Sequence, residues 1–171
     1  MNKNIIIFTD GSCIKTAYNK YYAGYGIHFP NKELPDISKP FLMIPITSQR
    51  AELYAILKAL KKIIKFLEFD TITIYSDSEY SIKSLTNWIF TWVKNKWKRS
   101  NNKPVKNKDI LEPLYKLIMK YKDKIKFQHV RSHTKQKDYC SIGNDKADKL
   151  ALKGSIKSKK IINKIKQLKK N

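Results

Sequence analysis

The chain has 171 residues, a hydrophobic fraction of 42% and an aromatic fraction of 12%, which is enough for one domain with a buried core and excludes wholesale disorder. Its 36 Lys and Arg residues outnumber its 14 Asp and Glu residues, and the formal net charge is +22. Such an excess repels itself in a compact fold and therefore favours a polyanionic partner such as nucleic acid. The alternative is a genome biased towards lysine codons, since only three of the basic residues are arginine.

The two cysteines, Cys13 and Cys140, exclude a disulfide framework and a four-thiolate zinc site. The apolar segment near the N-terminus, residues 5–8, is too short for a secretion signal, and no other stretch approaches the ~20 apolar residues of a membrane span. We therefore expect no membrane association and an intracellular protein, in the cytoplasm or the nucleus.

The first third of the chain is typical of strands. Residues 5–9 are mostly β-branched and are followed by a turn signal at 10–12, so they predict a buried strand that ends before Asp10. Residues 22–29 and 41–46 predict a second and a third strand, with spacing that suits an antiparallel meander.

The rest of the chain alternates between helix and strand patterns. Residues 48–51 are expected to open a helix, because the apolar residues that follow recur at helical spacing as far as Leu67. The other predicted elements are a strand at 71–76, a helix at 80–88 capped by Ser78, a helix at 109–121, a strand at 125–130 and a helix at 144–153. This order predicts an α/β fold in which a mixed sheet carries helices on its faces. We divide the chain into a domain at 1–154 and a Lys-rich tail at 155–171, which is either an amphipathic helix or a disordered arm.

Four acidic residues stand at positions that need a reason in so basic a protein. Asp10 and Asp77 follow predicted strands, Glu52 is placed in the first turn of the first long helix, and Asp148 lies in the last helix. If the two strands are neighbours, their aspartates converge at one edge of the sheet and a helix carboxylate can close over them. The plainer interpretation makes the aspartates turn residues and Glu52 an anion that stabilises a helix N-terminus.

Clustered carboxylates repel one another unless a cation holds them together. Ligation by oxygen alone suits Mg²⁺, for which Mn²⁺ can substitute, and two such ions roughly 3.5–4 Å apart can hold the oxygens of a phosphoryl displacement. The four acids therefore predict a site for metal-dependent phosphoryl chemistry.

Five short motifs resemble, in this order, the signatures of type 1 ribonuclease H. They are Thr9-Asp10-Gly11-Ser12, Gln49-Arg50-Ala51-Glu52-Leu53, Ser76-Asp77-Ser78, Val130-Arg131-Ser132-His133-Thr134 and Gly143-Asn144-Asp145-Lys146-Ala147-Asp148-Lys149-Leu150-Ala151. The resemblance covers about residues 4–154. It implies the ribonuclease H-like fold, a five-stranded mixed sheet with three leading antiparallel strands and flanking helices. It also implies cleavage of the RNA strand of RNA–DNA hybrids with two divalent ions, giving 5′-phosphate and 3′-hydroxyl ends.

The same resemblance assigns roles to single residues. Asp10, Glu52, Asp77 and Asp148 match the metal ligands. Asp145 matches a second acidic residue that lies outside the primary ligands, and His133 matches a loop histidine that assists proton transfer or product release.

A basic segment with tryptophans resembles the protrusion with which some members of the family hold the DNA strand. Residues 94–108 contain seven basic residues and no acid, and Lys96, Lys98 and Lys103 are the expected contacts. Trp88 and Trp92 are spaced to share one helix face, where they either pack in the core or stack on a sugar or base.

Further substrate contacts follow from the resemblance alone. Thr47 and Asn107 match a DNA-phosphate pocket, and Cys13 and Gln49 match the RNA side of the site. Ser48 stands where many relatives have an asparagine that contacts the RNA, and its shorter side chain reaches less far towards the RNA 2′-hydroxyl.

Other functions compete with a hybrid-specific nuclease. One is a catalytically silent nucleic-acid-binding module of the same fold, which the intact set of four acids opposes. Another is a transposase or junction resolvase, which would lack the histidine loop followed by the 144–148 helix. We expect a monomer that binds hybrid specifically and other nucleic acids non-specifically through the lysines of its protrusion and tail.

Overall fold

The computed structural model describes residues 3–131 and 138–168, in which five strands form one sheet of order β3-β2-β1-β4-β5. Strands β2 and β3 run antiparallel to their neighbours, whereas β1, β4 and β5 are parallel, so the predicted five-stranded mixed sheet is confirmed. In chain order the elements are β1 (Asn4–Lys15), β2 (Tyr21–His28), β3 (Ile37–Phe41), α1 (Ser48–Phe66), β4 (Thr71–Ser76), α2 (Glu79–Lys83), η1 (Ser84–Trp88), α3 (Ile89–Lys94), α4 (Lys108–Lys120), β5 (Ile125–His129) and α5 (Tyr139–Leu168).

Strand β1 is longer than its apolar core predicts, and the expectation that it ends before Asp10 is wrong. It pairs with β4 only as far as Phe8, opposite Tyr75, and then continues to Lys15 against β2 alone. Asp10 therefore lies inside a strand, paired with Gly26, at the point where β1 has left β4. The polar residues 10–12 are tolerated in this part of β1 because it pairs with a strand on one side only.

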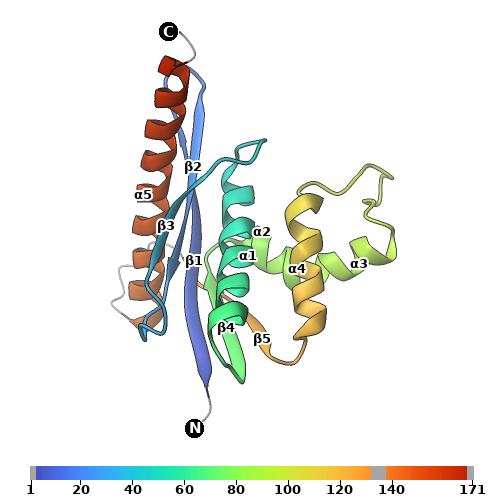
Figure 1. Cartoon of the computed structure of the whole chain (residues 1–171). Helices are drawn as coiled ribbons and strands as arrows, with labels where there is room; N and C mark the ends of the chain where they lie inside the picture. Colours follow the sequence, from blue (N-terminus) through green and yellow to red (C-terminus); the bar gives the residue numbers. More distant parts are fainter. Residues whose placement is uncertain (1–2, 132–137, 169–171) are drawn as a thin grey trace.

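Helices cover the two faces of the sheet separately. Figure 1 shows α5 along one face and α1 along the other, with α4 and α3 beyond α1. Helix α5 packs very closely on β2: a Cβ atom at Gly24 would lie 2.1 Å from the backbone nitrogen of Ser155, and one at Gly26 would lie 2.3 Å from the carbonyl oxygen of Ala147. Glycine is therefore required where the helix crosses the strand.

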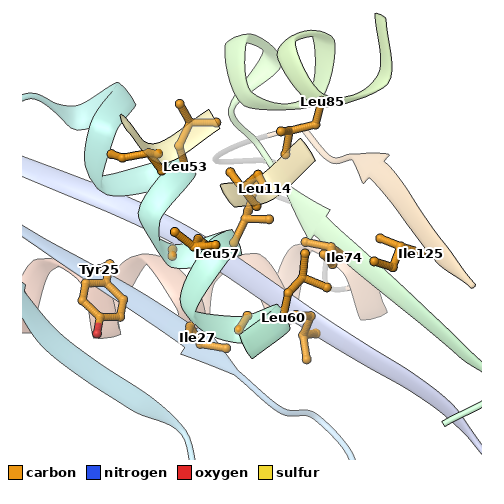
Figure 2. Close-up of a cluster of buried hydrophobic side chains, with 14 of the residues drawn as sticks. Tyr25, Ile27, Leu53, Leu57, Leu60, Ile74, Leu85, Leu114 and Ile125 are labelled. Carbon is orange, nitrogen blue, oxygen red and sulfur yellow. The ribbon is translucent and has the colours of Figure 1, made fainter. Parts of the chain in front are cut away.

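The main hydrophobic core fills the space between α1 and the sheet (Figure 2). Leu53, Leu57 and Leu60 come from α1, and Ile27 and Ile74 come from the sheet; all five are buried. The helical spacing of the α1 residues and the alternation in β4 are what the sequence predicts.

The third strand lies earlier than predicted. Residues 41–46 were expected to be extended, but β3 covers Ile37–Phe41 and contributes only Phe41 from that stretch. Strand β3 is an edge strand, so it accommodates Pro40, whose missing N–H needs no partner on the open side. The following Leu42 and Ile44 are exposed, so that apolar run belongs to a loop rather than to the core.

The predicted helix at 80–88 is part of a longer helical segment. It begins as α2, capped by the Ser78 hydroxyl, which accepts a hydrogen bond from the Ser81 N–H at 3.2 Å. It then passes through the π-helical turn η1 and continues as α3 to Lys94.

The last helix is far longer than the predicted segment 144–153. Helix α5 starts at Tyr139 and runs without a break past residue 154 to Leu168, so the helical alternative for the tail is the one observed. Ser155 and Ser158 are fully buried, and the Lys157 ammonium donates to the Ser38 carbonyl at 2.9 Å. The division into a domain and a tail at 154 stays a prediction. No helix in residues 3–131 and 138–168 is long and apolar enough to cross a membrane.

Candidate active site

The sheet register places Asp10 and Asp77 at the same level on neighbouring strands. The last β1–β4 pair joins Phe8 to Tyr75, and each aspartate follows its strand's member of that pair by two residues. The expectation that the two carboxylates meet at one edge of the sheet required β1 and β4 to be neighbours, and the observed strand order meets that condition.

Helices α1 and α5 bring the other two acids to the same place. A Cβ atom at Gly11 would lie 2.2 Å from the backbone nitrogen of Glu52, so α1 sits directly on β1 beside Asp10. The close contact of α5 with Gly26, the strand partner of Asp10, likewise sets the position of Asp148. Glu52 lies in the second turn of α1, and no acidic residue occupies the first turn, so its predicted place and the interpretation as a helix-dipole anion are both wrong.

Electrostatics show that the four acids share one environment. Burial, the largest cause, and the nearby carboxylates of Asp77, Asp148 and Glu52 together raise the pKa of Asp10 from 3.8 to about 7, against a hydrogen bond from the Gly11 N–H that lowers it. Burial also raises the pKa of Glu52, as does the charge of Asp77, while a hydrogen bond from Ser78 opposes the shift. These carboxylates are close enough to repel one another.

Neutral side chains, rather than basic ones, hold these acids. The Ser78 hydroxyl donates to Glu52, and the Asn144 amide donates to an Asp77 carboxylate oxygen at 3.0 Å. His129 Nε2 lies 3.2 Å from the backbone carbonyl of Asp77. From the sequence, Ser78 is expected only as a helix cap, and Asn144 and His129 receive no role of their own. The one signal for Asn144 in the sequence is its place four residues before Asp148 on the same helix face, which does not reveal its bond to Asp77.

The site has no internal counter-charge. Among the ion pairs of the described residues, none involves Asp10, Glu52, Asp77 or Asp148. In residues 3–131 and 138–168, no three acidic, histidine or cysteine side chains are grouped closely enough to enclose a metal ion as they stand. The carboxylates are thus within electrostatic range but not drawn together. Their chemistry, oxygen donors only with unneutralised negative charge, still fits a hard divalent cation.

A second feature lies at the start of α1, where Thr47 and Asn107 come together. A pocket of about 410 Å³ is lined by both of them and also by Pro45, Gln49, Arg50 and Lys106. Thr47 caps the helix by accepting a hydrogen bond from the Arg50 N–H at 3.2 Å. The predicted proximity of Thr47 and Asn107 is thus observed, 60 residues apart in the chain.

Arg50 organises this pocket, and the sequence did not single it out. Its buried guanidinium forms two hydrogen bonds with Asp109, at 2.8 and 2.6 Å, and a third with the Asn107 side-chain oxygen at 3.3 Å. Asn107, which adopts a left-handed backbone conformation, also donates to the Tyr80 hydroxyl at 3.0 Å. The buried Arg50–Asp109 ion pair therefore fixes Asn107 at the pocket, and the exposed Lys106 in its lining supplies a positive charge suited to a phosphate.

The other predicted substrate contacts are distributed around these two features. Ser48 and Gln49 are exposed in the first turn of α1, and the half-buried Cys13 packs against the core, where burial raises the pKa of its thiol. Trp92 packs on the core, which favours the structural interpretation for it. Trp88 is 39% exposed, and its ring lies tilted against that of Trp92 with the ring centroids 5.8 Å apart.

The basic segment forms a projection of its own. Figure 1 shows α3 and the loop after it extending away from the sheet. A pocket of about 450 Å³ in this loop is lined by Lys96 and Lys98 among other polar residues, and Lys103 is exposed nearby. The projection matches the predicted basic protrusion in composition.

Two predicted residues complete the set. Asp145 lies exposed on α5, three residues before the half-buried Asp148. His133 falls outside the described residues, so its predicted role stays a prediction.

Comparison with known proteins identifies the family. The family model described as RNase H matches residues 2–156. A ribonuclease H of Haemophilus influenzae is 38% identical over 156 residues, covering 91% of this chain and 92% of the relative. A ribonuclease H of Schizosaccharomyces pombe is 37% identical over 150 residues, covering 88% of this chain. The chain spans only 52% of that yeast relative, and 62% of a relative from Acanthamoeba polyphaga mimivirus.

The fold agrees with that assignment. The solution structure of the PFV RNase H domain superimposes with a TM-score of 0.75 at 28% identity, covering 91% of this chain and 96% of that one. A foamy viral protease-reverse transcriptase solved in complex with an RNA/DNA hybrid matches with a TM-score of 0.73 at 23% identity, covering 88% of this chain and 20% of the other, which supports the fold alone. From the motifs, the sheet order and these matches together, the chain belongs to the RNase H family.

Proposed function

We propose that this protein hydrolyses the RNA strand of RNA–DNA hybrids with two divalent cations held by Asp10, Glu52, Asp77 and Asp148. One observation carries the proposal: three carboxylates lie within electrostatic range of the buried Asp10 in a protein of net charge +22, yet none of the four acids is ion-paired within the described residues. Uncompensated carboxylates at a buried site are costly unless a cation binds there. Membership of the RNase H family supports the same activity.

When bound, the cations supply Lewis-acid stabilisation to the oxygens of the scissile phosphate and activate the attacking water. The chain's own contribution is to position the carboxylates. Ser78 holds Glu52 and Asn144 holds Asp77, so two of the four acids have fixed orientations. We propose Mg²⁺ as the ion and Mn²⁺ as a substitute, because the donors are all oxygens.

The remaining residues hold the hybrid. In this proposal the pocket lined by Thr47 and Asn107 binds a phosphate of the DNA strand. Gln49, Ser48 and Cys13 lie on the RNA side. The basic projection, with Lys96, Lys98 and Lys103, adds phosphate contacts, and Trp88 offers an exposed ring.

Two further roles belong to the proposal. His133 assists proton transfer or product release, and Asp145 influences the metal site from outside the ligand set. Cleavage leaves 5′-phosphate and 3′-hydroxyl ends.

A silent binding module is not favoured. Buried anions facing a phosphate backbone weaken binding, so a pure binder gains nothing from Asp10 and its neighbours.

A substrate panel tests the proposal. End-labelled RNA–DNA hybrid, double-stranded RNA and double-stranded DNA are each incubated with the protein in Mg²⁺ and, separately, in excess chelator. We expect cleavage of the RNA in the hybrid only, and none in chelator. Equal cutting of double-stranded RNA, or undiminished cutting in chelator, would contradict the proposal.

A further inference from the structure

The groove between α1 and the edge strand β3 is lined by lysines that the catalytic site does not use. Lys58, Lys61, Lys62 and Lys65 share one face of α1, because their spacing follows the helical period. Lys39 faces them from β3. With Tyr25 and Ile37 these five lysines enclose a pocket of about 300 Å³, which we call the distal lysine groove.

No acidic residue neutralises this groove. None of its five lysines takes part in an ion pair in the part of the chain that the structure describes. After Glu52, helix α1 contains no acidic residue at all. Like charges four residues apart, such as Lys58 with Lys62 and Lys61 with Lys65, destabilise a helix. The arrangement therefore costs stability unless an anion binds.

The floor of the groove carries a hydroxyl that a ligand can reach. Tyr25 is only 6% exposed as a residue, but within the described residues its hydroxyl forms no hydrogen bond and is not among the enclosed polar atoms that lack a partner, so it opens into the groove. A tyrosine with a buried ring commonly presents its hydroxyl to a polar partner in this way. Figure 2 shows this hydroxyl pointing away from the leucine cluster of α1. The ring packs edge-on against Tyr54 at 5.3 Å, and the Lys58 ammonium lies 5.3 Å above the Tyr54 ring, so the donor and one lysine are held in place.

We propose that the distal lysine groove binds successive phosphates of a nucleic-acid strand, at a site separate from the carboxylates that cut. The rise of α1 puts Lys58 about 9 Å and Lys65 about 20 Å from Glu52 along the helix axis. The row from Lys58 to Lys65 spans about 10.5 Å, which corresponds to about three nucleotide steps at ~3.4 Å of duplex axis per step. The groove thus holds nucleic acid that flanks the cleavage site or belongs to a second molecule.

The experiment measures salt-dependent binding of a 25-base-pair DNA duplex, which the proposed activity does not cut. The first variant replaces four groove lysines with glutamine: Lys58, Lys61, Lys62 and Lys65. The control variant removes the same charge from exposed lysines of α4, β5 and the turn between them: Lys116, Lys120, Lys122 and Lys126. A third variant is Tyr25→Phe, which removes one hydroxyl and preserves the packing of the ring.

In the groove variant we expect the slope of log affinity against log salt to become shallower by about 2 to 3, since each neutralised duplex phosphate contributes ~0.9. The control variant should change the slope by less than 1, and Tyr25→Phe should weaken binding several-fold with the slope unchanged. Equal effects of the groove and control variants would overturn the proposal, because they would show that net charge alone matters. If Tyr25→Phe binds the duplex as tightly as the wild type, the claim that the Tyr25 hydroxyl contacts the strand is wrong.

Two further measurements separate this proposal from its alternatives. Inorganic pyrophosphate binding as tightly as the duplex would make a free polyphosphate the ligand and overturn the assignment to a strand. The turnover of hybrid at saturation should be unchanged in the groove variant. A wild-type protein that cuts no hybrid would refute the proposed activity while leaving the binding slopes, and hence this inference, to stand or fall by themselves.

Discussion

Replacing Asp10 with asparagine should stabilise the metal-free protein at neutral and alkaline pH. The carboxyl is 7% exposed, and burial with neighbouring charges raises its pKa from 3.8 to about 7. The folded state therefore binds the proton more tightly than the unfolded state does. Stability attributable to this group is lost as the pH rises from about 4 through about 7, and the loss is complete above that range. A difference of about 3 pKa units corresponds to a ceiling of about 4 kcal/mol in the free energy of unfolding.

Urea denaturation in excess chelator measures this effect at pH 5 and pH 8. We expect Asp10→Asn to exceed the wild type in unfolding free energy at pH 8, with a smaller difference at pH 5. Excess Mg²⁺ should stabilise the wild type and not the variant, since only the wild type has the full ligand set. Asp145→Asn is the control: its carboxylate is exposed on α5 and should change stability by less than about 0.5 kcal/mol. A wild type as stable as Asp10→Asn at pH 8 in chelator would refute the account of an uncompensated buried charge.

Three other perturbations have definite outcomes. Asn144→Ala frees the Asp77 carboxylate and should lower the single-turnover cleavage rate more than tenfold while hybrid affinity is retained; an unchanged rate would mean that Asp77 needs no such support. Asp109→Ala leaves the buried Arg50 guanidinium without its partner and should cost about 1–3 kcal/mol in chemical denaturation, which a neutral result would contradict. Deleting residues 155–171 removes buried serines that pack on the sheet, so it should lower the melting temperature sharply, and a fully stable truncated protein would refute that packing.

The deleted segment is one for which the sequence leaves two alternatives, an amphipathic helix or a disordered arm. Ser155 and Ser158 look like polar residues of a charged tail, because hydropathy does not reveal that a helix crosses a glycine-bearing strand at very short distance. The signal lay in the pairing of Gly24 with Gly154, which are 130 residues apart and meet only in the folded chain.

The core was predictable for a local reason. The apolar period of α1 and the alternation of β4 are set within a few residues, and each element buries the face that its pattern indicates. The third strand was misplaced because Leu42 and Ile44 are apolar but exposed, and an apolar run alone does not show whether a neighbouring strand pairs with it.

The candidate site was predictable in its acids and not in their supports. Asp10 and Asp77 stand out because each directly follows an apolar, β-branched run in so basic a chain. Ser78 and Asn144 do not, because serine and asparagine are ordinary in turns and helix starts. Their role depends on contacts between α1, β4 and α5 that only the tertiary structure supplies.

The most direct test of the central claim compares cleavage with binding in the same samples. The single-turnover rate and the affinity for an RNA–DNA hybrid are measured in Mg²⁺ for the wild type and for Asp77→Asn. We predict a rate reduced almost to the level seen in chelator, with affinity equal to or higher than that of the wild type, because removing an anion from a phosphate-facing site relieves repulsion. A variant that cuts the hybrid at nearly the wild-type rate would contradict the claim that these carboxylates hold the catalytic ions.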